Sequence, residues 1–205
     1  MTLTLLHTAK AHCASFDALR DRIAPDIPMV QTVRTDWLER AQAGISPDLE
    51  AEISATIADA PGPVICTCTT IGPAAEAAGA LRIDWPMMQE AARIGGPVVL
   101  AYCLHSTWEP SLTLLERALA ESGQKTTVHP MPLTEYWPLF EAGQPDAFAA
   151  VIASEIRQVA TGHRKIGCVV LAQASMSGAA QLLGDLDVPV LTSPELALRA
   201  GMARL

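Results

Sequence analysis

The stretch Val64-Ile65-Cys66-Thr67-Cys68-Thr69-Thr70-Ile71-Gly72 leads into an alanine-rich segment that opens with Pro73. Its apolar, β-branched start, its small polar end and the following proline predict a buried strand, a tight turn and the start of a helix. Cys68 is therefore expected in the turn between strand and helix. In parallel α/β sheets, such turns open onto the crevice where ligands bind.

A helix start has chemical consequences for a thiol. The first amides of a helix carry unpaired N–H groups and partial positive charge, which favour an anion. We expect them to lower the pKa of Cys68 toward neutrality, where a thiol can act as a general acid or base. With Thr69 and Thr70, the same amides could hold a carboxylate or an enolate oxygen. The competing interpretation is a cysteine that is simply buried in a strand.

The composition limits the function classes. The chain has 205 residues, of which 50% are hydrophobic and 18% charged, enough for one large domain or two small ones. A net charge of −8 without a Lys/Arg cluster argues against nucleic acid as a partner. No apolar run approaches a membrane span, and the first residues lack the features of a signal peptide, so we expect no membrane partner and a cytoplasmic location. Five irregularly spaced cysteines favour free thiols in a reducing compartment.

Apolar runs and helical patterns alternate along the whole chain, which predicts parallel sheets with βαβ crossovers. The expected fold is α/β, with two pseudo-symmetric, Rossmann-like parallel-sheet domains and a cleft between them. We assign residues 1–95 to an N-terminal half, 96–190 to a C-terminal half, and 191–205 to a terminal helix that packs back on the N-terminal half. The expected strands cover 3–7, 28–33, the run before Cys68, 81–83, 98–103, 125–129, 166–172 and 188–191, and the longer expected helices cover 47–60, 85–94, 107–121 and 145–161.

The two halves resemble each other in sequence. A shift of 105 positions lays Val64 on Val169, and a shift of 96 lays Ser15 on Ser111, each with further matches of common residue types. Chance is the alternative, but two offsets in the same order favour an ancient duplication. Under the first shift, Cys68 corresponds to Gln173. The two would face each other across the expected cleft, together with three further polar strand ends: His7-Thr8, His105-Ser106-Thr107 and Ser175.

Over essentially its whole length the chain resembles the aspartate/glutamate/hydantoin racemase superfamily. The segment from Thr67 to Pro73 is similar to that family's first cysteine motif, and Val169 to Met176 falls where the second should be. His7-Thr8, Asp36-Trp37-Leu38 and Arg82-Ile83-Asp84 also fit the pattern. The resemblance implies a cofactor-free racemase or isomerase acting on a small carboxylic acid, with one cysteine on each face of the α-carbon, and a homo-oligomer, as a dimer.

The second cysteine position holds Gln173, and an amide does not exchange a proton near neutral pH. Two-thiol racemisation is therefore not expected. Three chemistries remain open. Cys68 could protonate one face of a carbanion formed by decarboxylation, it could attack an activated double bond, as in the maleate-isomerase-like members of the family, or a histidine could replace the missing acid/base. For that last role His105 and His7 are the candidates.

Three further interpretations compete. Cys66, Cys68, Cys103, His105 and the His12-Cys13 pair could suggest a metal site, although C-x-C lacks the spacer of a zinc knuckle. Cys66 and Cys68 could form a redox pair, although neighbours on an extended strand lie near the distance limit for a disulfide. The chain could also be a catalytically silent protein that binds a small carboxylate.

The predicted site follows from the motif positions and the resemblance. The expected catalytic residues are Cys68 and His105, with no metal and no cofactor. The expected substrate-binding residues share strand-end positions: His7, Thr8, Thr69, Thr70, Ser106, Thr107, Gln173, Ala174, Ser175 and Met176.

Overall fold

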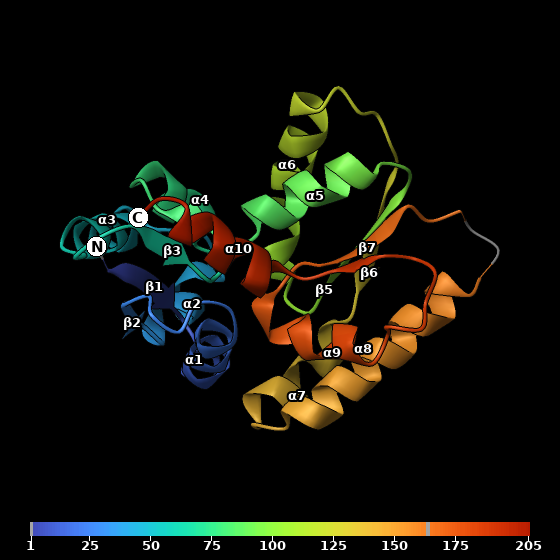
Figure 1. Ribbon diagram of the computed structural model, residues 1–205, viewed down its shortest axis with the longest axis horizontal. Coiled ribbons are helices and arrows are strands. Elements are labelled where there is room, and N and C mark those ends of the chain that lie inside the picture. Colours follow the sequence, from blue (N-terminus) through green and yellow to red (C-terminus); the bar gives the residue numbers. More distant parts are fainter. Residues whose placement is uncertain (1, 163–164) are drawn as a thin grey trace. The chain divides into compact units, whose positions relative to one another are not determined.

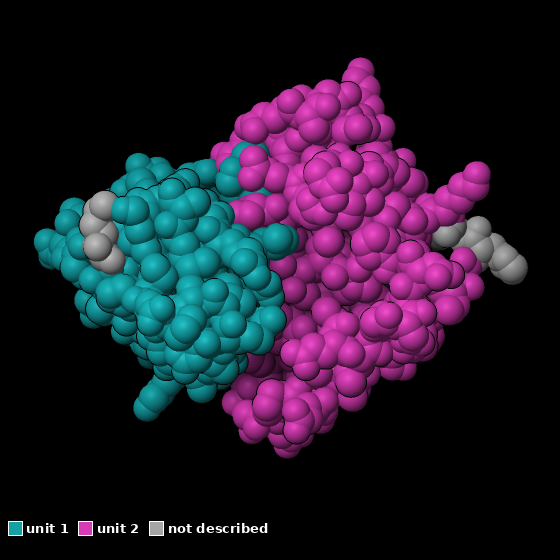
Figure 2. Space-filling model, viewed as in Figure 1, with its two compact units in different colours: residues 1–85, 194–205 teal, residues 86–193 magenta. Residues whose placement is uncertain are grey.

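The computed structural model describes residues 2–162 and 165–205. The chain divides into two units, shown in different colours in Figure 2: unit 1 is Met1–Trp85 with Pro194–Leu205, and unit 2 is Pro86–Ser193. Each unit carries one four-stranded parallel sheet (Figure 1). The predicted α/β fold with two parallel sheets is confirmed.

The sheet of unit 1 has the order β2-β1-β3-β4. Its second strand, β1, pairs with a neighbour on each side, and all five of its residues are buried. A strand covered on both faces needs a continuous apolar run, which residues 3–6 largely provide. The strands are β1 (Leu3–His7), β2 (Met29–Val33), β3 (Val64–Cys66) and β4 (Leu81–Arg82).

Helices cover both faces of this sheet. Leu6 and Cys66 pack in one core cluster with Leu49, Ile53 and other side chains of α2, α3 and α4. The helices of unit 1 are α1 (Ala11–Ile23), α2 (Asp36–Ala41), α3 (Pro47–Ala58), α4 (Gly72–Ala77) and α10 (Ser193–Met202), whose first residue belongs to unit 2.

The opposite face of the sheet receives α10. A Cβ atom added at Gly201 would lie 2.5 Å from Ile65 Cδ1 and 3.1 Å from Leu3 Cδ1. The glycine therefore lets the helix backbone rest directly on β1 and β3. Both ends of the chain consequently lie in unit 1.

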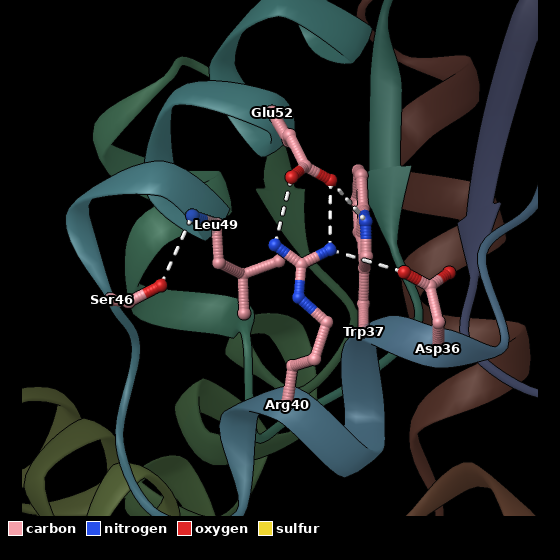
Figure 3. A network of polar contacts seen from close by, with 6 residues as sticks. All are labelled: Asp36, Trp37, Arg40, Ser46, Leu49 and Glu52. Carbon is pink, nitrogen blue, oxygen red and sulfur yellow. Dashed lines mark hydrogen bonds and ion pairs between the residues drawn. The ribbon is translucent and has the colours of Figure 1, made fainter.

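Polar contacts join α2 to α3 (Figure 3). The guanidinium of Arg40 donates to both carboxylate oxygens of Glu52, at 2.9 and 2.8 Å, and to Asp36 at 3.1 Å. The indole N–H of Trp37 donates to the same Glu52 at 3.2 Å. The ion pairs are largely exposed, so each contributes little to stability, and the burial of Trp37 contributes more.

The start of α3 is as the sequence predicts. The hydroxyl of Ser46 accepts from the amide of Leu49 at 3.3 Å, and Pro47 occupies the first helical position. Thr35 precedes α2 in the same way, but its side chain makes no capping bond.

We expect Ser46→Ala to lower the free energy of unfolding by about 1 kcal/mol, because it leaves a helix amide without its acceptor. Urea unfolding measures the change. Thr35→Ala is the matched control and should change the value by less than about 0.5 kcal/mol. Equal losses in the two variants would contradict the capping role of Ser46.

Unit 2 repeats the strand order of unit 1 as β6-β5-β7-β8. Its strand β5 again lies second in the sheet and is buried at every residue. The strands are β5 (Val98–Tyr102), β6 (Val128–Pro132), β7 (Cys168–Leu171) and β8 (Val190–Leu191).

The predicted strand over 125–129 is misplaced. The observed strand, β6, begins at Val128 and continues through Pro130 to Pro132. The amide of Leu133 donates to the Tyr102 carbonyl, and the carbonyl of Thr127 accepts from the amide of Val98. The backbone N–H and C=O groups of the odd-numbered residues therefore point toward β5. Residues alternate along a strand, which directs the two prolines to the outer edge, where no N–H is needed for the sheet.

The helices of unit 2 lie on both sides of its sheet, with α5 and α6 over one face and α7, α8 and α9 over the other (Figure 1). Phe148, Ile152 and Ile156 of α8 pack against Val169 and Leu171 of β7 in one core cluster. The helices are α5 (Trp85–Ile94), α6 (His105–Glu121), α7 (Trp137–Glu141), α8 (Pro145–Ala160) and α9 (Ser177–Gln181), with short 3₁₀ helices η1 (Thr134–Tyr136) and η2 (Ala174–Met176).

The first unit boundary falls at Trp85 rather than at residue 95. Trp85 is the first residue of α5, and the rest of this helix, with buried Met87, Met88 and Ala91, belongs to unit 2. Within the described residues, no helix combines the length and the apolar character that crossing a membrane requires.

Candidate functional site

The turn between β3 and α4 carries Cys68. The strand ends at Cys66, and the amide of Thr67 still donates to the carbonyl of Leu6 at 2.9 Å. Cys68 therefore lies just past the strand, and only 9% of its surface is exposed. The amide of Gly72 donates to the carbonyl of Thr69 at 3.1 Å, which closes the turn before α4.

Four donors surround the sulfur of Cys68. They are the hydroxyls of Thr8 and Thr70 and the backbone amides of Thr70 and Ile71. Each lowers the pKa of the thiol, but burial raises it more, so that the pKa of Cys68 lies above its ordinary value. The prediction of a lowered pKa is therefore wrong, because it counted the helix amides and left out desolvation.

The residues that precede Thr8 and Cys68 in the sequence, His7 and Thr67, also form a hydrogen bond. His7 precedes Thr8 at the end of β1, and its imidazole Nδ1 lies 2.8 Å from the hydroxyl oxygen of Thr67, which precedes Cys68. Its Nε2 lies 2.9 Å from Gln31 Oε1 on β2. His7 is fully buried, with both ring nitrogens engaged inside unit 1. Its predicted contact with a substrate stays a prediction.

The hydrogen bonds of Gln31 fix the tautomer of His7. Its side-chain amine donates to the Cys13 carbonyl at 3.3 Å and to the Asp17 carboxylate at 2.9 Å, neither of which can donate in return. Its oxygen must then accept from His7 Nε2, which leaves Nδ1 of the neutral ring to accept from Thr67. Protonation of the ring would turn the Thr67 hydroxyl to the Leu6 carbonyl, 3.1 Å away.

Burial keeps two neighbouring imidazoles neutral. It lowers the pKa of His7, and together with the His7 ring, whose centroid lies 6.0 Å away, it lowers the pKa of His12 to about 4. The unfolded chain therefore binds these protons more readily than the folded protein. The stability that the neutral rings contribute is complete above about pH 6.5 and is lost as the pH falls toward 4.

We accordingly expect the free energy of unfolding to fall by about 1–2 kcal/mol between pH 7 and pH 5. Carboxylates with lowered pKa values contribute below this window and do not obscure it. Urea unfolding at several pH values measures the slope, which His12→Gln should flatten. If His12→Gln showed the same slope as the natural chain, the assignment to His12 would be refuted.

In unit 2 the side chain of Gln173, just past β7, bonds to the turn between β5 and α6. Its Oε1 accepts from the amides of Cys103, at 2.6 Å, and Leu104, at 3.2 Å. Because both partners are N–H donors, the oxygen must face them. Gln173 is buried, with 8% of its surface exposed, and it ties the end of β7 to the start of α6.

The backbone shows that Cys68 and Gln173 occupy equivalent positions in the two topologies. Thr67 donates to Leu6 on β1 as Ala172 donates to Ala101 on β5, and the next residue in each case is Cys68 or Gln173. By the same register, Thr8 is equivalent to Cys103. The sulfur of Cys68 therefore contacts Thr8 as the oxygen of Gln173 contacts Cys103.

The remaining predicted residues lie on both units. Thr69 is buried in the β3–α4 turn. α6 begins two residues earlier than predicted, so that its first turn contains exposed His105, half-buried Ser106 and buried Thr107. Ala174, Ser175 and Met176 form η2, and within the described residues the hydroxyl of Ser175 is buried without a hydrogen-bond partner. Their role toward a substrate stays a prediction.

The sequence interpretation missed Thr67, Gln31 and Cys103. Thr67 was visible in the first motif, but its role depends on pairing with His7 across two strands. Cys103 was noted only as a thiol, whereas its amide is what Gln173 binds. Neither contact has a local sequence signal, because each joins residues at least 60 positions apart.

The competing thiol interpretations can be placed as well. All five cysteines are free, so Cys66 and Cys68 form no disulfide. The Cys66 thiol instead donates to the backbone carbonyl oxygen of Cys68 at 3.5 Å. Among residues 2–162 and 165–205, no group of three or more His, Cys, Asp or Glu side chains is placed to hold a metal ion.

No protein-family model matches the chain, and no curated protein matches it by sequence. Solved structures do match. A glutamate racemase from Bacillus anthracis matches with a TM-score of 0.69 and 14% sequence identity. A glutamate racemase from Francisella tularensis, solved in complex with D-glutamate, matches with a TM-score of 0.70 and 11% sequence identity. Each of the two alignments covers 98% of this chain and 80% of the racemase chain. An allantoin racemase from Klebsiella pneumoniae has 0.59 at 17% identity, with 99% and 87% covered. The chain therefore has the fold of the glutamate and allantoin racemases.

Proposed function

We propose that the chain is a cofactor-independent enzyme that moves a proton at a carbon of a small carboxylic acid, with Cys68 as the acid/base. The observation that carries the proposal is the set of four donors around the Cys68 sulfur. A neutral thiol does not need so many donors, whereas a thiolate formed during a reaction is stabilised by them. The racemase fold supports the same class of chemistry.

The raised pKa of Cys68 sets the direction of the first step. The resting group is a thiol, so it can donate its proton to a carbanion or enolate of the substrate. The S–H bond breaks, a C–H bond forms, and the sulfur keeps the electron pair as a thiolate. The hydroxyls of Thr8 and Thr70 and the amides of Thr70 and Ile71 then hold that charge. The reverse step returns the proton to the same sulfur.

A single thiol predicts one-sided proton exchange. Gln173 occupies the position equivalent to Cys68, and its amide cannot take or give a proton near neutral pH. Inversion would need another acid/base, for which exposed His105 is the proposed group. One-sided protonation alone would suffice after a decarboxylation, and a thiolate would suffice for addition to an activated double bond.

The test is to incubate the protein in D₂O with small amino, hydroxy and unsaturated dicarboxylic acids and to follow deuterium at carbon by NMR. We expect label, or isomerised product, and a loss of about 10²-fold or more in Cys68→Ala. Cys13→Ala, which removes a half-buried thiol on α1, is the control and should keep the rate. Unchanged turnover in Cys68→Ala would end the catalytic assignment.

A second experiment tests the role of the glutamine. We expect label with retained configuration in the natural chain and loss of optical purity in Gln173→Cys, which restores the second thiol of the racemase pattern. Gln173→Ala removes the same acceptor from the amides of Cys103 and Leu104 without adding a thiol, so it controls for that loss. Inversion by the natural chain at the full exchange rate would contradict one-sided transfer unless His105→Gln abolished it.

A silent binding protein is the second candidate. It is favoured by the low exposure of Cys68 and by the occupied oxygen of Gln173, which acts as a fixed clamp rather than a titrating group. Calorimetric binding of a small carboxylate with neither label nor isomerisation in the same panel would support it.

A further inference from the structure

A buried ion pair lies beside the turn that carries Cys68. Arg82, the last residue of β4, donates from Nε to Asp84 Oδ1 at 3.0 Å and from Nη2 to Asp84 Oδ2 at 2.8 Å. The two side chains are only 5% and 0% exposed. Burying two charges costs free energy even when they are paired, so stability alone does not explain the presence of this pair.

The guanidinium rests on the first residue of α4. A Cβ atom added at Gly72 would lie 3.0 Å from Arg82 Nε and 3.3 Å from its Cζ. Any larger residue would have to push the guanidinium or the turn aside. The bidentate bond to Asp84 fixes the plane of the guanidinium, so that it forms a rigid support under Gly72.

That support lies next to the donors of the Cys68 sulfur. Gly72 directly follows Thr70 and Ile71, whose amides are two of the four donors. Arg82 also pairs with Cys66 in the sheet, and the amide of Ile83 donates to the Cys66 carbonyl at 3.0 Å. The Arg82–Asp84 pair therefore contacts the turn at Gly72, and the backbone of β4 is bonded to β3 at Cys66, where the turn begins.

We propose that Arg82, held by Asp84, is a positioning residue that presses the Thr70–Gly72 turn into the geometry in which its amides converge on the Cys68 sulfur. Arg82 acts through the turn and does not itself contact the reacting atoms. The inference deepens the proposed function, since it assigns the residues that build the thiolate site. It concerns the thiol itself and can be tested without a substrate.

The test is the pH dependence of Cys68 alkylation by iodoacetamide, read by site-resolved mass spectrometry that separates Cys68 from Cys66. The thiolate is the reacting form, so the midpoint of the profile follows its stabilisation. We expect the midpoint to rise by about one pH unit in Gly72→Ala and Arg82→Met, which is about tenfold less thiolate at a fixed pH. Arg82→Lys should give a smaller rise, because an ammonium cannot make the bidentate bond.

Arg157→Met is the matched control. Arg157 makes a bidentate pair with Asp185 at 2.7 and 2.9 Å, but in unit 2 and on the surface. Its removal should leave the Cys68 midpoint unchanged. Thermal unfolding checks that each variant is folded, and Gly72→Ala, which keeps both charges, decides the matter if Arg82→Met does not fold.

An unchanged midpoint in folded Gly72→Ala overturns the proposal, as does an equal shift in Arg157→Met. The outcome is independent of turnover. If the midpoint shifts in the variants but the natural chain labels no substrate, the positioning role is supported and the proposed enzyme is refuted. If the natural chain turns over substrate but the midpoint does not shift in the variants, the enzyme is supported and the positioning role is refuted.

Discussion

Both units depend on a strand that is buried along its whole length and paired on both sides. The backbone groups of β1 and β5 have no access to water, so each must be satisfied by the neighbouring strands. This requirement fixes the register of β3 and β7, down to the last bonds from Thr67 to Leu6 and from Ala172 to Ala101. The residues that come next in the sequence after Thr67 and Ala172 are Cys68 and Gln173. The strand pairing therefore fixes the backbone position at which each of them begins its turn.

Much of the fold could be predicted because periodicity and apolar runs are local signals. Leu3–His7 and Trp85–Ile94 have the predicted bounds, and Ser46-Pro47 starts its helix as expected. The strand through Pro130 was missed, because proline argues against a strand unless its edge position is known. The likeness to the racemase superfamily is confirmed at the level of the fold, while the ancestral duplication and the cleft between the halves stay predictions.

The candidate site was harder to predict than the fold. The sequence indicated which groups stand at the strand ends, and Thr8, Cys68 and Thr70 do meet. It could not indicate how much water each group loses on folding, and this loss reversed the expected pKa shift of Cys68 and lowered the pKa of His7. The two equivalent positions thus differ: Cys68 can exchange a proton, whereas the amide of Gln173 binds the backbone of the neighbouring turn after β5.

The prolines of β6 have a consequence for how copies of this chain can associate. At two alternate positions the outer margin of that strand presents carbonyl oxygens but no hydrogen to share, so a further extended segment laid alongside would leave its own acceptors unmet. The sheet of unit 2 is closed to growth on that side. Any assembly that this protein forms must therefore use side-chain surfaces or another margin, and accidental strand-to-strand aggregation is blocked there.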